Sequence, residues 1–550
     1  MRRCAKVLSS PYVLAIVLLV LALGLRLFGI ADAPARTDDL YNFIAAQSWA
    51  ENGTLAMADG YYTRTRYFSI ATAWFLEIFG ENLGAARAFA ALGGALLAPL
   101  TALWLRRTGN VTAAWVAGLL LCISYTCITW SQVVRFYSWH ALAMLVLAIT
   151  VFTMVTRMST LRPLQWALLM VCALLALLAG MHLQAITVLM IVALAVWTGL
   201  FLPLTGRLNF IFSSPKLLLL SLVVVVVGVA AVLTVGRPIL LEKWAELREA
   251  SAWSQENQDN WVFYLDHLTH QLNWLFVLLP VAAIIAWRRY PTVTLFCVTI
   301  SLVCLGLHTL AGMKALRYVI YLFPFMFAIW GLAFSIIVPA LARAIPASPA
   351  LLRPAVLGGG MLAVAAVSAV VVTDFRMTGA AIARAVRTGS TFQPSDYGFG
   401  RDQVFWEPYL PQLRALQKSG IFVVSDSNRA IYYLDDYDVL LSKTELSDIG
   451  TSEFLLDPRT GKRNISTGAS IRKVIDCYPK GTVLATEAQW RSAYVLPEAA
   501  SVIEKETSRV PLPNQLNMRA YRWDHALPAN PTACKPIYDL IGKAPKRATR

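Results

Sequence analysis

The feature of this sequence that most limits its fold is a series of long apolar runs. A run of about 20 apolar residues can cross the hydrocarbon core of a bilayer as one helix. The first run, PYVLAIVLLVLALGLRLFGI, ends at Ile30, and others follow near residues 84–105, 111–130, 138–156, 164–180, 183–203, 217–235, 273–287, 292–310, 317–341 and 355–373. The runs predict a polytopic α-helical membrane protein with about 11 transmembrane helices.

The composition supports a membrane location. The 550 residues are 57% apolar and 15% charged, whereas soluble domains average about 45–50% apolar and about 25% charged residues. The formal net charge is +16, and most of the basic excess lies in residues 1–373, where Lys and Arg in loops orient transmembrane helices. We therefore expect membrane lipids, and no nucleic acid, among the partners.

The loops between the runs alternate in charge, which predicts an orientation. The basic start MRRCAK and the long first run predict a retained signal anchor with a cytoplasmic N-terminus. Every second loop is basic and is expected on the same side, with Arg106, Arg107, Arg157, Arg162, Arg207, Lys216, Arg288, Arg289, Arg343 and Arg353. The other loops, above all 31–83 and 236–272, and the region after residue 373 are expected on the outer side of a bacterial inner (plasma) membrane.

The composition changes to that of a soluble domain beyond Asp374. Short β-rich runs such as GIFVVSDSN and GTVLATE alternate with helical stretches such as PYLPQLRALQKSG. This alternation predicts a periplasmic or extracellular α/β domain over residues 374–550, after a transmembrane module over residues 1–373. Cys477 and Cys534 could form a disulfide there, although their spacing alone also allows two free thiols.

Polar residues that could form a site gather in the outer loops. Loop 31–83 begins with two adjacent carboxylates, Asp38 and Asp39, which could be catalytic or could cap a short helix. The other candidates in the outer loops and at the adjoining ends of the runs are Tyr41, Arg64, Arg66, Arg135, Tyr137, His182, His267, His270, Lys314 and Arg317. Because one membrane interface is predicted to hold them all, they could converge on one site.

The order of these motifs resembles the GT-C superfamily of membrane glycosyltransferases, which includes protein O-mannosyltransferases, the lipid A aminoarabinose transferase and rhizobial galacturonosyltransferases. RTDDLYNFIAAQSWAENG is similar to their DE-x-x-Y-x-x-x-A opening, and VRFYSWHALAML to their R-x-Y at the start of the fourth span. GMHLQAITVL resembles their H-Y turn, and ALRYVIYLFPF their R-Y-x-x-x-x-x-P. The resemblance covers roughly residues 1–340 as a pattern.

The resemblance implies an inverting transfer of a sugar from a polyprenyl-phosphate donor to an envelope lipid, glycan or protein. A leaving phosphate needs cations that stabilise its charge, and the candidates are Arg64, Arg66, Arg317 and, more weakly, Lys314. An acceptor hydroxyl needs a carboxylate that takes its proton. Asp38 or Asp39 fits that role. Because adjacent side chains of one helix do not face the same cleft, one of the pair is expected to cap the helix or to orient a partner. The position within the family pattern favours Asp38 as the base.

The sequence departs from the family pattern in two places. The aminoarabinose transferase has a lysine in its first loop where Arg64 or Arg66 stands here, which leaves the phosphate ligand open. The pair is DD instead of DE, which shortens the second carboxylate and weakens the case for a metal. No cofactor is otherwise expected, although Asp38 and Asp39, together with His267 and His270, could hold a divalent metal ion.

Two other classes of function are compatible with a polytopic envelope protein. A transporter or flippase for lipid-linked saccharides would have charged or broken helices near the middle of the bilayer and internal repeats, and the sequence has few of the former and no evident repeat. A non-enzymatic scaffold that binds glycans would leave the arginines and carboxylates of the first loop without a shared purpose.

Overall fold

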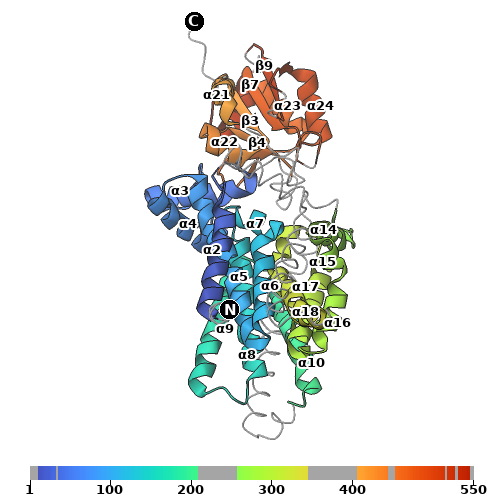
Figure 1. The fold of residues 1–550 in the computed structure, drawn as a ribbon. Helices are drawn as coiled ribbons and strands as arrows, with labels where there is room; N and C mark the ends of the chain where they lie inside the picture. The colour runs from blue at the N-terminus through green and yellow to red at the C-terminus, as the bar shows by residue number, and fades with distance from the viewer. Residues whose placement is uncertain are drawn as a thin grey trace, which may run out of the picture.

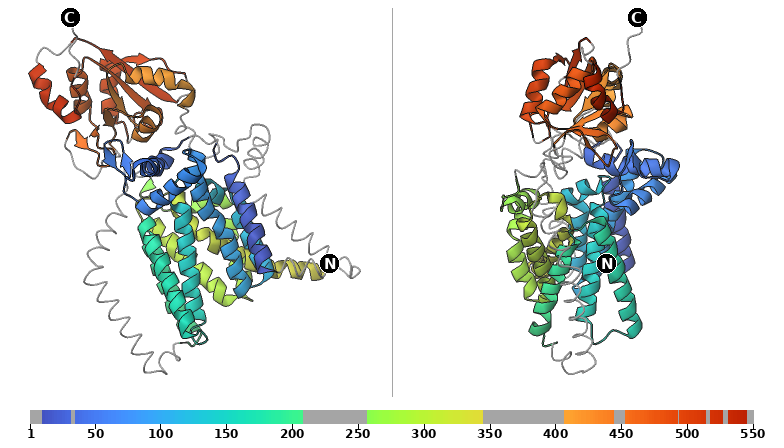
Figure 2. Two further views of the ribbon diagram at one scale, coloured as in Figure 1. Left: turned by 90° about the vertical axis from the view of Figure 1, so that its left-hand side faces the viewer. Right: turned by 180° about the vertical axis from the view of Figure 1, so that it is seen from behind.

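The computed structural model describes residues 10–31, 35–207, 257–344, 406–443, 453–492, 494–513, 517–526 and 531–544. It has a bundle of long helices and, beyond one end of the bundle, an α/β domain (Figure 1). A layer of short elements from residues 37–79 lies between the two parts (Figure 2). We call the end of the bundle that faces the α/β domain the domain-bearing end.

Six helical segments of the described chain are long and apolar enough to cross a membrane. They are α5 (Leu83–Thr108), α8 (Tyr137–Thr156), α9 (Pro163–Leu183), α10 (Thr187–Leu204), α17 (Pro291–Leu310) and the segment Ile320–Leu341, which contains η4 (Ile320–Leu322) and most of α18 (Phe323–Ala344). A seventh would be the bent pair α6 (Val111–Ile123) and α7 (Tyr125–Ser131). These helices make the chain a membrane protein.

The expected number of about 11 spans remains a prediction. The runs at 217–235 and 355–373 lie outside the described residues. The run at 273–287 forms two short helices, α15 (Trp274–Val277) and α16 (Leu279–Trp287), and α2 (Pro11–Leu27) is apolar but only 17 residues long.

A buried arginine forms hydrogen bonds at the bend between α6 and α7. The two helices meet at Ser124 with an angle of 56°, so the last carbonyls of α6 are not all used within a helix. Arg26 of α2 is fully buried and donates hydrogen bonds to the carbonyls of Leu121 (3.0 Å) and Cys122 (3.3 Å). The Arg26 guanidinium thus provides hydrogen bonds to carbonyl groups that the break leaves without helical partners.

Small residues allow the helices of the bundle to approach closely. A Cβ atom at Gly94 of α5 would lie 2.0 Å from Ser131 Oγ, and one at Gly93 would lie 2.9 Å from the Trp139 indole. Glycine at these positions therefore lets α7 and α8 pack directly against the backbone of α5.

The C-terminal domain has one seven-stranded sheet in the order β5-β6-β4-β3-β7-β9-β8. Strands β3, β4, β6 and β7 are parallel, with Val423 of β3 beside both Val439 and Val483, and β5, β9 and β8 pair antiparallel at the edges. The strands are β3 (Ile421–Val424), β4 (Val439–Leu441), β5 (Leu455–Leu456), β6 (Arg463–Ile465), β7 (Lys480–Thr486), β8 (Ser508–Val510) and β9 (Met518–Asp524).

Helices pack on this sheet, and the four residues of β3 are all buried. The helices are α21 (Leu410–Gln417), α22 (Ser427–Leu434), α23 (Gly468–Cys477), α24 (Pro497–Glu506) and α25 (Pro531–Ile541). Cys477, at the end of α23, and Cys534 of α25 form a disulfide. The described part of this region is thus an α/β domain, and the expected boundary at residue 374 lies outside the described residues.

The intermediate layer consists of α3 (Thr37–Asn52), the hairpin β1 (Ala56–Met57) and β2 (Gly60–Tyr61), and α4 (Arg66–Phe79). The helix α14 (Phe263–Leu272) also lies at the domain-bearing end, on the opposite side of the bundle from α3 in Figure 1. This layer places the loop with the acidic pair directly between the membrane bundle and the C-terminal domain.

Candidate functional site

Asp38 lies in the first turn of α3, between two arginines from distant parts of the chain. Its Oδ1 accepts a hydrogen bond from Arg135 Nη2 at 3.3 Å, and its Oδ2 accepts one from Arg317 Nη1 at 3.1 Å. Arg135 comes from the turn before α8, and Arg317 from η3 (Leu316–Tyr318) before α18. The carboxylate keeps 28% of its side-chain surface exposed, so a substrate can still reach it.

The charges around Asp38 keep it ionised. Partial burial alone would raise the pKa of its carboxyl, but the positive charges of Arg317, Arg135, Arg64 and Arg36 outweigh burial and hold the pKa below its ordinary value. The side chain is therefore a carboxylate throughout the physiological pH range.

Asp39 has a different environment. It is fully buried and pairs with Arg87 Nη2 of α5 at 2.6 Å. Its oxygens also accept hydrogen bonds from the backbone N–H groups of Arg36 (3.3 Å) and Val134 (2.7 Å). As placed here, Asp39 cannot touch a substrate; it joins the start of α3 to α5 and to the turn that carries Arg135.

Arg135 is held on several sides. Its Nη1 donates to Tyr62 Oη at 2.9 Å and to Asn42 Oδ1 at 3.2 Å. Its guanidinium lies 5.4 Å from the centre of the Tyr41 ring and 5.6 Å from that of Phe136. Its buried Nε has no hydrogen-bond partner among the described residues.

Aromatic rings surround Arg317. The guanidinium lies 5.9 Å from the ring centres of both Trp130 and Tyr137, and 5.5 Å from that of Tyr318. Cation–π contacts of this kind hold a guanidinium in place without neutralising it. Tyr137 thus contributes its ring to the site.

Arg64 and Arg66 lie on the exposed side of the same region. Arg64 is 6.0 Å from the centre of the Phe136 ring, and Arg66 is 5.2 Å from that of Tyr67. The backbone N–H of Tyr67 donates to His182 Nε2 at 3.4 Å, so His182, at the end of α9, lies beside α4. Both arginines are exposed, which leaves them accessible to an anionic group.

Three of the candidate residues have contacts elsewhere. Lys314 donates to the carbonyls of Gln258 and Ala311. On α14, the half-buried His267 and the exposed His270 lie beside Asp266, at 3.9 Å and 3.5 Å. The structure brings none of these three side chains into contact with Asp38.

The residues proposed as metal ligands do not form a donor set. The oxygens of Asp38 and Asp39 face arginines, whose positive charges oppose a cation, while His267 and His270 lie on α14. Among the described residues no group of three or more His, Cys, Asp or Glu side chains could hold a metal ion.

The sequence was compared with known proteins, and no family model and no curated protein matches it. Solved structures do match. ArnT from Cupriavidus metallidurans has a TM-score of 0.55 in the apo state, with 15% identity over 92% of this chain and 97% of ArnT. ArnT bound to undecaprenyl phosphate has a TM-score of 0.57, with 14% identity over 94% and 99%.

An archaeal protein has a similar fold. The oligosaccharyltransferase AglB from Archaeoglobus fulgidus, in complex with an inhibitory peptide and a dolichol-phosphate, has a TM-score of 0.51 and 12% identity over 91% of this chain and 72% of AglB. ArnT and AglB are both GT-C enzymes. The chain has the GT-C fold. The expectation of this fold from the order of weak sequence motifs is confirmed.

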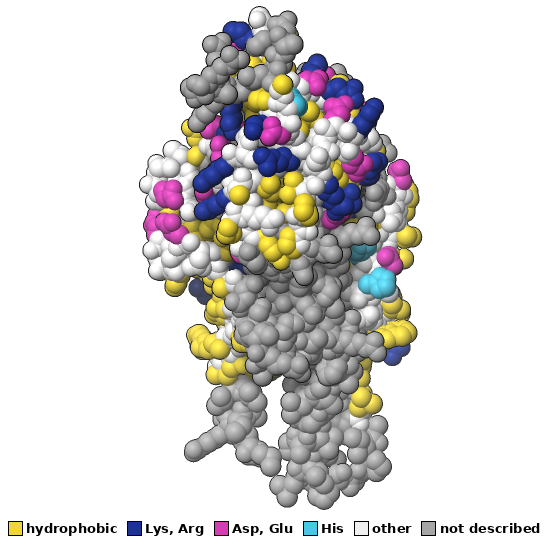
Figure 3. All heavy atoms as spheres, turned by 90° about the horizontal axis from the view of Figure 1, so that it is seen from above, with side chains coloured by type: hydrophobic (Ala, Val, Ile, Leu, Met, Phe, Trp, Pro, Cys, Tyr) yellow, Lys and Arg dark blue, Asp and Glu magenta, His cyan; other side chains and the backbone are white. Residues whose placement is uncertain are grey.

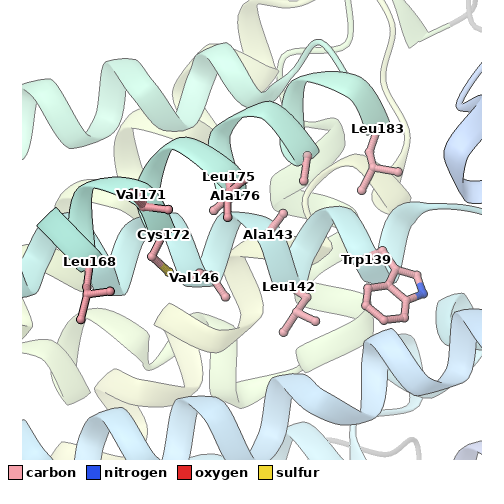
Figure 4. Close-up of a pocket in the computed structure, with 11 residues that line it drawn as sticks. Trp139, Leu142, Ala143, Val146, Leu168, Val171, Cys172, Leu175, Ala176 and Leu183 are labelled. Carbon is pink, nitrogen blue, oxygen red and sulfur yellow. The ribbon is translucent and has the colours of Figure 1, made fainter.

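The GT-C bundle of this chain also contains an apolar groove between α8 and α9 (Figure 4). The groove has a volume of about 440 Å³ and eleven lining residues, all from α8 and α9: Trp139, Leu142, Ala143, Val146, Leu168, Val171, Cys172, Leu175, Ala176, Ala179 and Leu183. Its Trp139 and Leu183 end lies next to Tyr137 and His182, at the domain-bearing end. The groove therefore leads from the membrane region toward the exposed arginines.

Within this GT-C fold, sequence reasoning missed several residues that support the site. Arg87 lies in an apolar run, and an ionisable residue within a span usually has a buried partner; that signal could have identified it. Asn42, by contrast, gives no signal, because it is one of several amides in a polar helix. It accepts from Arg135 and donates to Thr65 Oγ1 (3.1 Å) and Ser69 Oγ (2.9 Å), which ties α3 to α4.

The C-terminal domain also contacts the start of α3, a contact that no local pattern indicates. Asp426 Oδ2 accepts from Thr37 Oγ1 at 3.0 Å, and Asn428 Nδ2 donates to the Thr37 carbonyl at 3.2 Å. Arg429 Nε donates to the Ala35 carbonyl at 3.3 Å and is paired with Asp426. The residue before Asp38 is thus bound on its side chain and on its backbone.

Proposed function

We propose that this chain is an inverting glycosyltransferase of the bacterial inner membrane. It moves a sugar from a polyprenyl-phosphate donor to a hydroxyl, or a phosphate, of an envelope lipid, glycan or protein on the outer face. The observation that supports this most is the convergence of one accessible carboxylate, Asp38, with Arg135 and Arg317 at the domain-bearing end of a GT-C bundle.

In this proposal Asp38 is the general base. The acceptor oxygen attacks the anomeric carbon and forms the new glycosidic bond while the bond between that carbon and the phosphate oxygen breaks. The acceptor proton passes to Asp38, and the electron pair of the broken bond leaves with the polyprenyl phosphate. Since a positioned base of this kind contributes about 10²–10⁴-fold in rate, it accounts for part of the catalysis only.

The arginines stabilise the departing phosphate. Arg64 and Arg66 are exposed and therefore accessible to a phosphate group. A guanidinium binds phosphate with directed, charge-assisted hydrogen bonds, and it does so best where the developing charge is shielded from water. Arg317, which lies within an aromatic cage, orients Asp38 and remains close to the reacting groups.

The apolar groove supports a lipid-linked donor. A polyprenyl tail lying along α8 and α9 would end beside Trp139 and Leu183 and present its phosphate to the domain-bearing end, where His182 and the exposed arginines lie. ArnT, with the same fold, has been solved with undecaprenyl phosphate. Such a donor requires a site that holds its polyprenyl tail within the membrane and its phosphate at the membrane surface.

Neither of the rival functions is favoured by a specific observation. A transporter would use the break in α6 and α7 as part of a pathway, but Arg26 occupies that break with hydrogen bonds to its carbonyls. A scaffold that recruits charged glycans would present a face of one sign. Figure 3 shows Lys and Arg interspersed with Asp and Glu over the C-terminal domain. Opposite charges pair there, as Arg472 does with Glu506.

The proposal is tested by looking for the product. Mass spectrometry of envelope lipids and glycans from a strain that lacks this chain should reveal one missing sugar, which the wild-type chain restores. Asp38→Asn should not restore it, whereas Asp266→Asn, which changes an exposed carboxylate on α14, should do so. Restoration by Asp38→Asn, at equal expression in the membrane, would contradict the proposed chemistry.

A further inference from the structure

One turn of the C-terminal domain packs directly on the hairpin after α3. The Asp59 N–H donates to the Thr460 carbonyl at 2.9 Å, and Lys462 Nζ pairs with Asp59 Oδ2 at 2.7 Å. A Cβ atom at Gly60 would lie 2.6 Å from the Arg459 carbonyl, and one at Gly461 would lie 2.6 Å from the Asp59 backbone. The two backbones therefore touch, with no side chain between them.

The same turn presents Arg459 to α3 in a single orientation. Asp457, which is fully buried, accepts from Arg459 Nε and Nη2, both at 2.9 Å. This bidentate pair fixes the plane of the guanidinium. The remaining Nη1 donates to Tyr41 Oη at 3.0 Å.

Tyr41 in turn forms the surface on which Arg135 lies. The centre of the Tyr41 ring is 5.4 Å from the Arg135 guanidinium, 5.5 Å from that of Arg459 and 5.2 Å from the stacked ring of Tyr62. Tyr62 Oη also accepts from Arg135. Since Arg135 donates to Asp38, a shift of the Tyr41 ring would be transmitted to the carboxylate.

We propose that Arg459 of the C-terminal domain is a positioning residue for glycosyl transfer. It fixes the Tyr41 ring, the ring seats Arg135, and Arg135 orients Asp38. This inference rests on the proposed function, and it gives the C-terminal domain a part in the active site that is separate from any binding of the acceptor.

The full-length chain is tested in detergent or proteoliposomes with a polyprenyl-phosphate sugar donor. Arg459→Gln should lower kcat roughly 10- to 100-fold, because small displacements of catalytic groups have effects of this size, and should change the donor KM less than twofold. Arg459→Lys keeps the charge but not the planar fork, so it should lose most of the same activity. Arg472→Gln, which breaks an exposed ion pair of the same domain, is the control and should leave kcat unchanged.

Tyr41→Phe separates positioning from a general loss of stability. It keeps the ring and removes only the hydroxyl that Arg459 contacts, so it should lower kcat about as much as Arg459→Gln. If the two residues act in series, the double variant should lose no more than either single variant. Additive losses, or a wild-type kcat in Arg459→Gln, would overturn the proposal.

Hydrogen exchange tests the same chain of contacts without turnover. Arg459→Gln should speed amide exchange in peptides that cover residues 38–44 and 131–138, and Arg472→Gln should not. Unchanged exchange in both peptides would overturn the proposal even in an active enzyme. A wild-type chain that transfers no sugar from any polyprenyl-phosphate donor would overturn the proposed function instead, while the exchange data would still decide whether Arg459 positions Arg135.

Discussion

Arg317 Nη1 lies 3.1 Å from Asp38 Oδ2, although 279 positions of the chain separate the two residues. The ion pair joins the helix that follows the first apolar run to the short 3₁₀ helix before the last described span. Together with Arg135 on the other carboxylate oxygen, it makes Asp38 the point at which three segments of the chain meet.

The first prediction concerns the dependence of activity on pH. Because arginine charges hold the pKa of Asp38 below its ordinary value, the acid limb of kcat should lie below the pH at which an ordinary aspartate titrates. Arg317→Gln removes a charge that opposes the effect of burial, so the pKa of Asp38 should rise and the acid limb should move to higher pH.

The measurement is kcat from pH 3.5 to 8 with a polyprenyl-phosphate donor, and the control is Arg289→Gln, in the loop between α16 and α17. An acid limb that stays in place in Arg317→Gln would show that another group controls it. The acid limb moves in the same direction as the pKa of Asp38, because the base must be unprotonated to accept a proton.

The second prediction concerns the buried pair of Asp39 and Arg87. Asp39→Asn leaves the Arg87 guanidinium buried without its counter-charge, which should lower stability by about 3–5 kcal/mol. Replacing both residues with leucine should recover part of this loss, because no unpaired charge remains. Thermal unfolding in detergent measures both effects.

The matched control for that variant is Asp266→Asn. Asp266 is 60% exposed, so its substitution should change stability by less than about 0.5 kcal/mol. If Asp39→Asn unfolded at the wild-type temperature, the contacts of Asp39 would contribute little to the fold, which would contradict this prediction.

The third prediction concerns the apolar groove. Ala176→Trp should fill the space between α8 and α9 and raise the KM for a donor with a full-length polyprenyl tail about 10-fold, a loss of about 1.4 kcal/mol in binding. A donor with a tail of a few isoprene units should be affected less. Leu174→Trp, at an exposed position of α9 outside the groove, should change neither value, and equal effects on both donors would argue against tail binding here.

The fourth prediction concerns the disulfide between Cys477 and Cys534. The bond closes a loop with a sequence separation of 57 residues, so its removal should destabilise the C-terminal domain by about 2–4 kcal/mol. Cys477→Ser with Cys534→Ser should therefore lower the thermal midpoint of that domain while kcat at low temperature stays unchanged. An unchanged midpoint would indicate that the two helices are held by packing alone.

The order of weak motifs was informative about the site because each motif lies at the end of an apolar run. Runs of spanning length place their ends at a membrane surface, so the acidic pair, Arg135 and Arg317 were predicted at one interface, and the structure brings Asp38, Arg135 and Arg317 together. The same reasoning included His267, His270 and Lys314, which lie at that end of the bundle but make no contact with Asp38. Location on one side of the membrane restricts the candidate residues to one surface, but it does not show which of them meet at one site.

The difference in environment between the two carboxylates is visible only in the folded chain. Asp38 and Asp39 are neighbours with the same chemistry, and position within a motif favoured Asp38 without a physical reason. The reason lies in Arg87 and in the N–H of Val134, which enclose Asp39. In the same way, Arg459 and Tyr41 are 418 positions apart, and nothing local to either residue indicates that they meet.

By itself, the sequence determined that the chain crosses a membrane, because runs of apolar residues as long as a bilayer is thick cannot be buried in any other way, and that a soluble α/β region follows them. Only the tertiary structure decided which polar side chains converge on Asp38 and which carboxylate stays accessible. Those outcomes depend on distances between segments that are from 48 to 279 positions apart. Hydrophobic periodicity, which acts over a few turns of helix, carries no information about them.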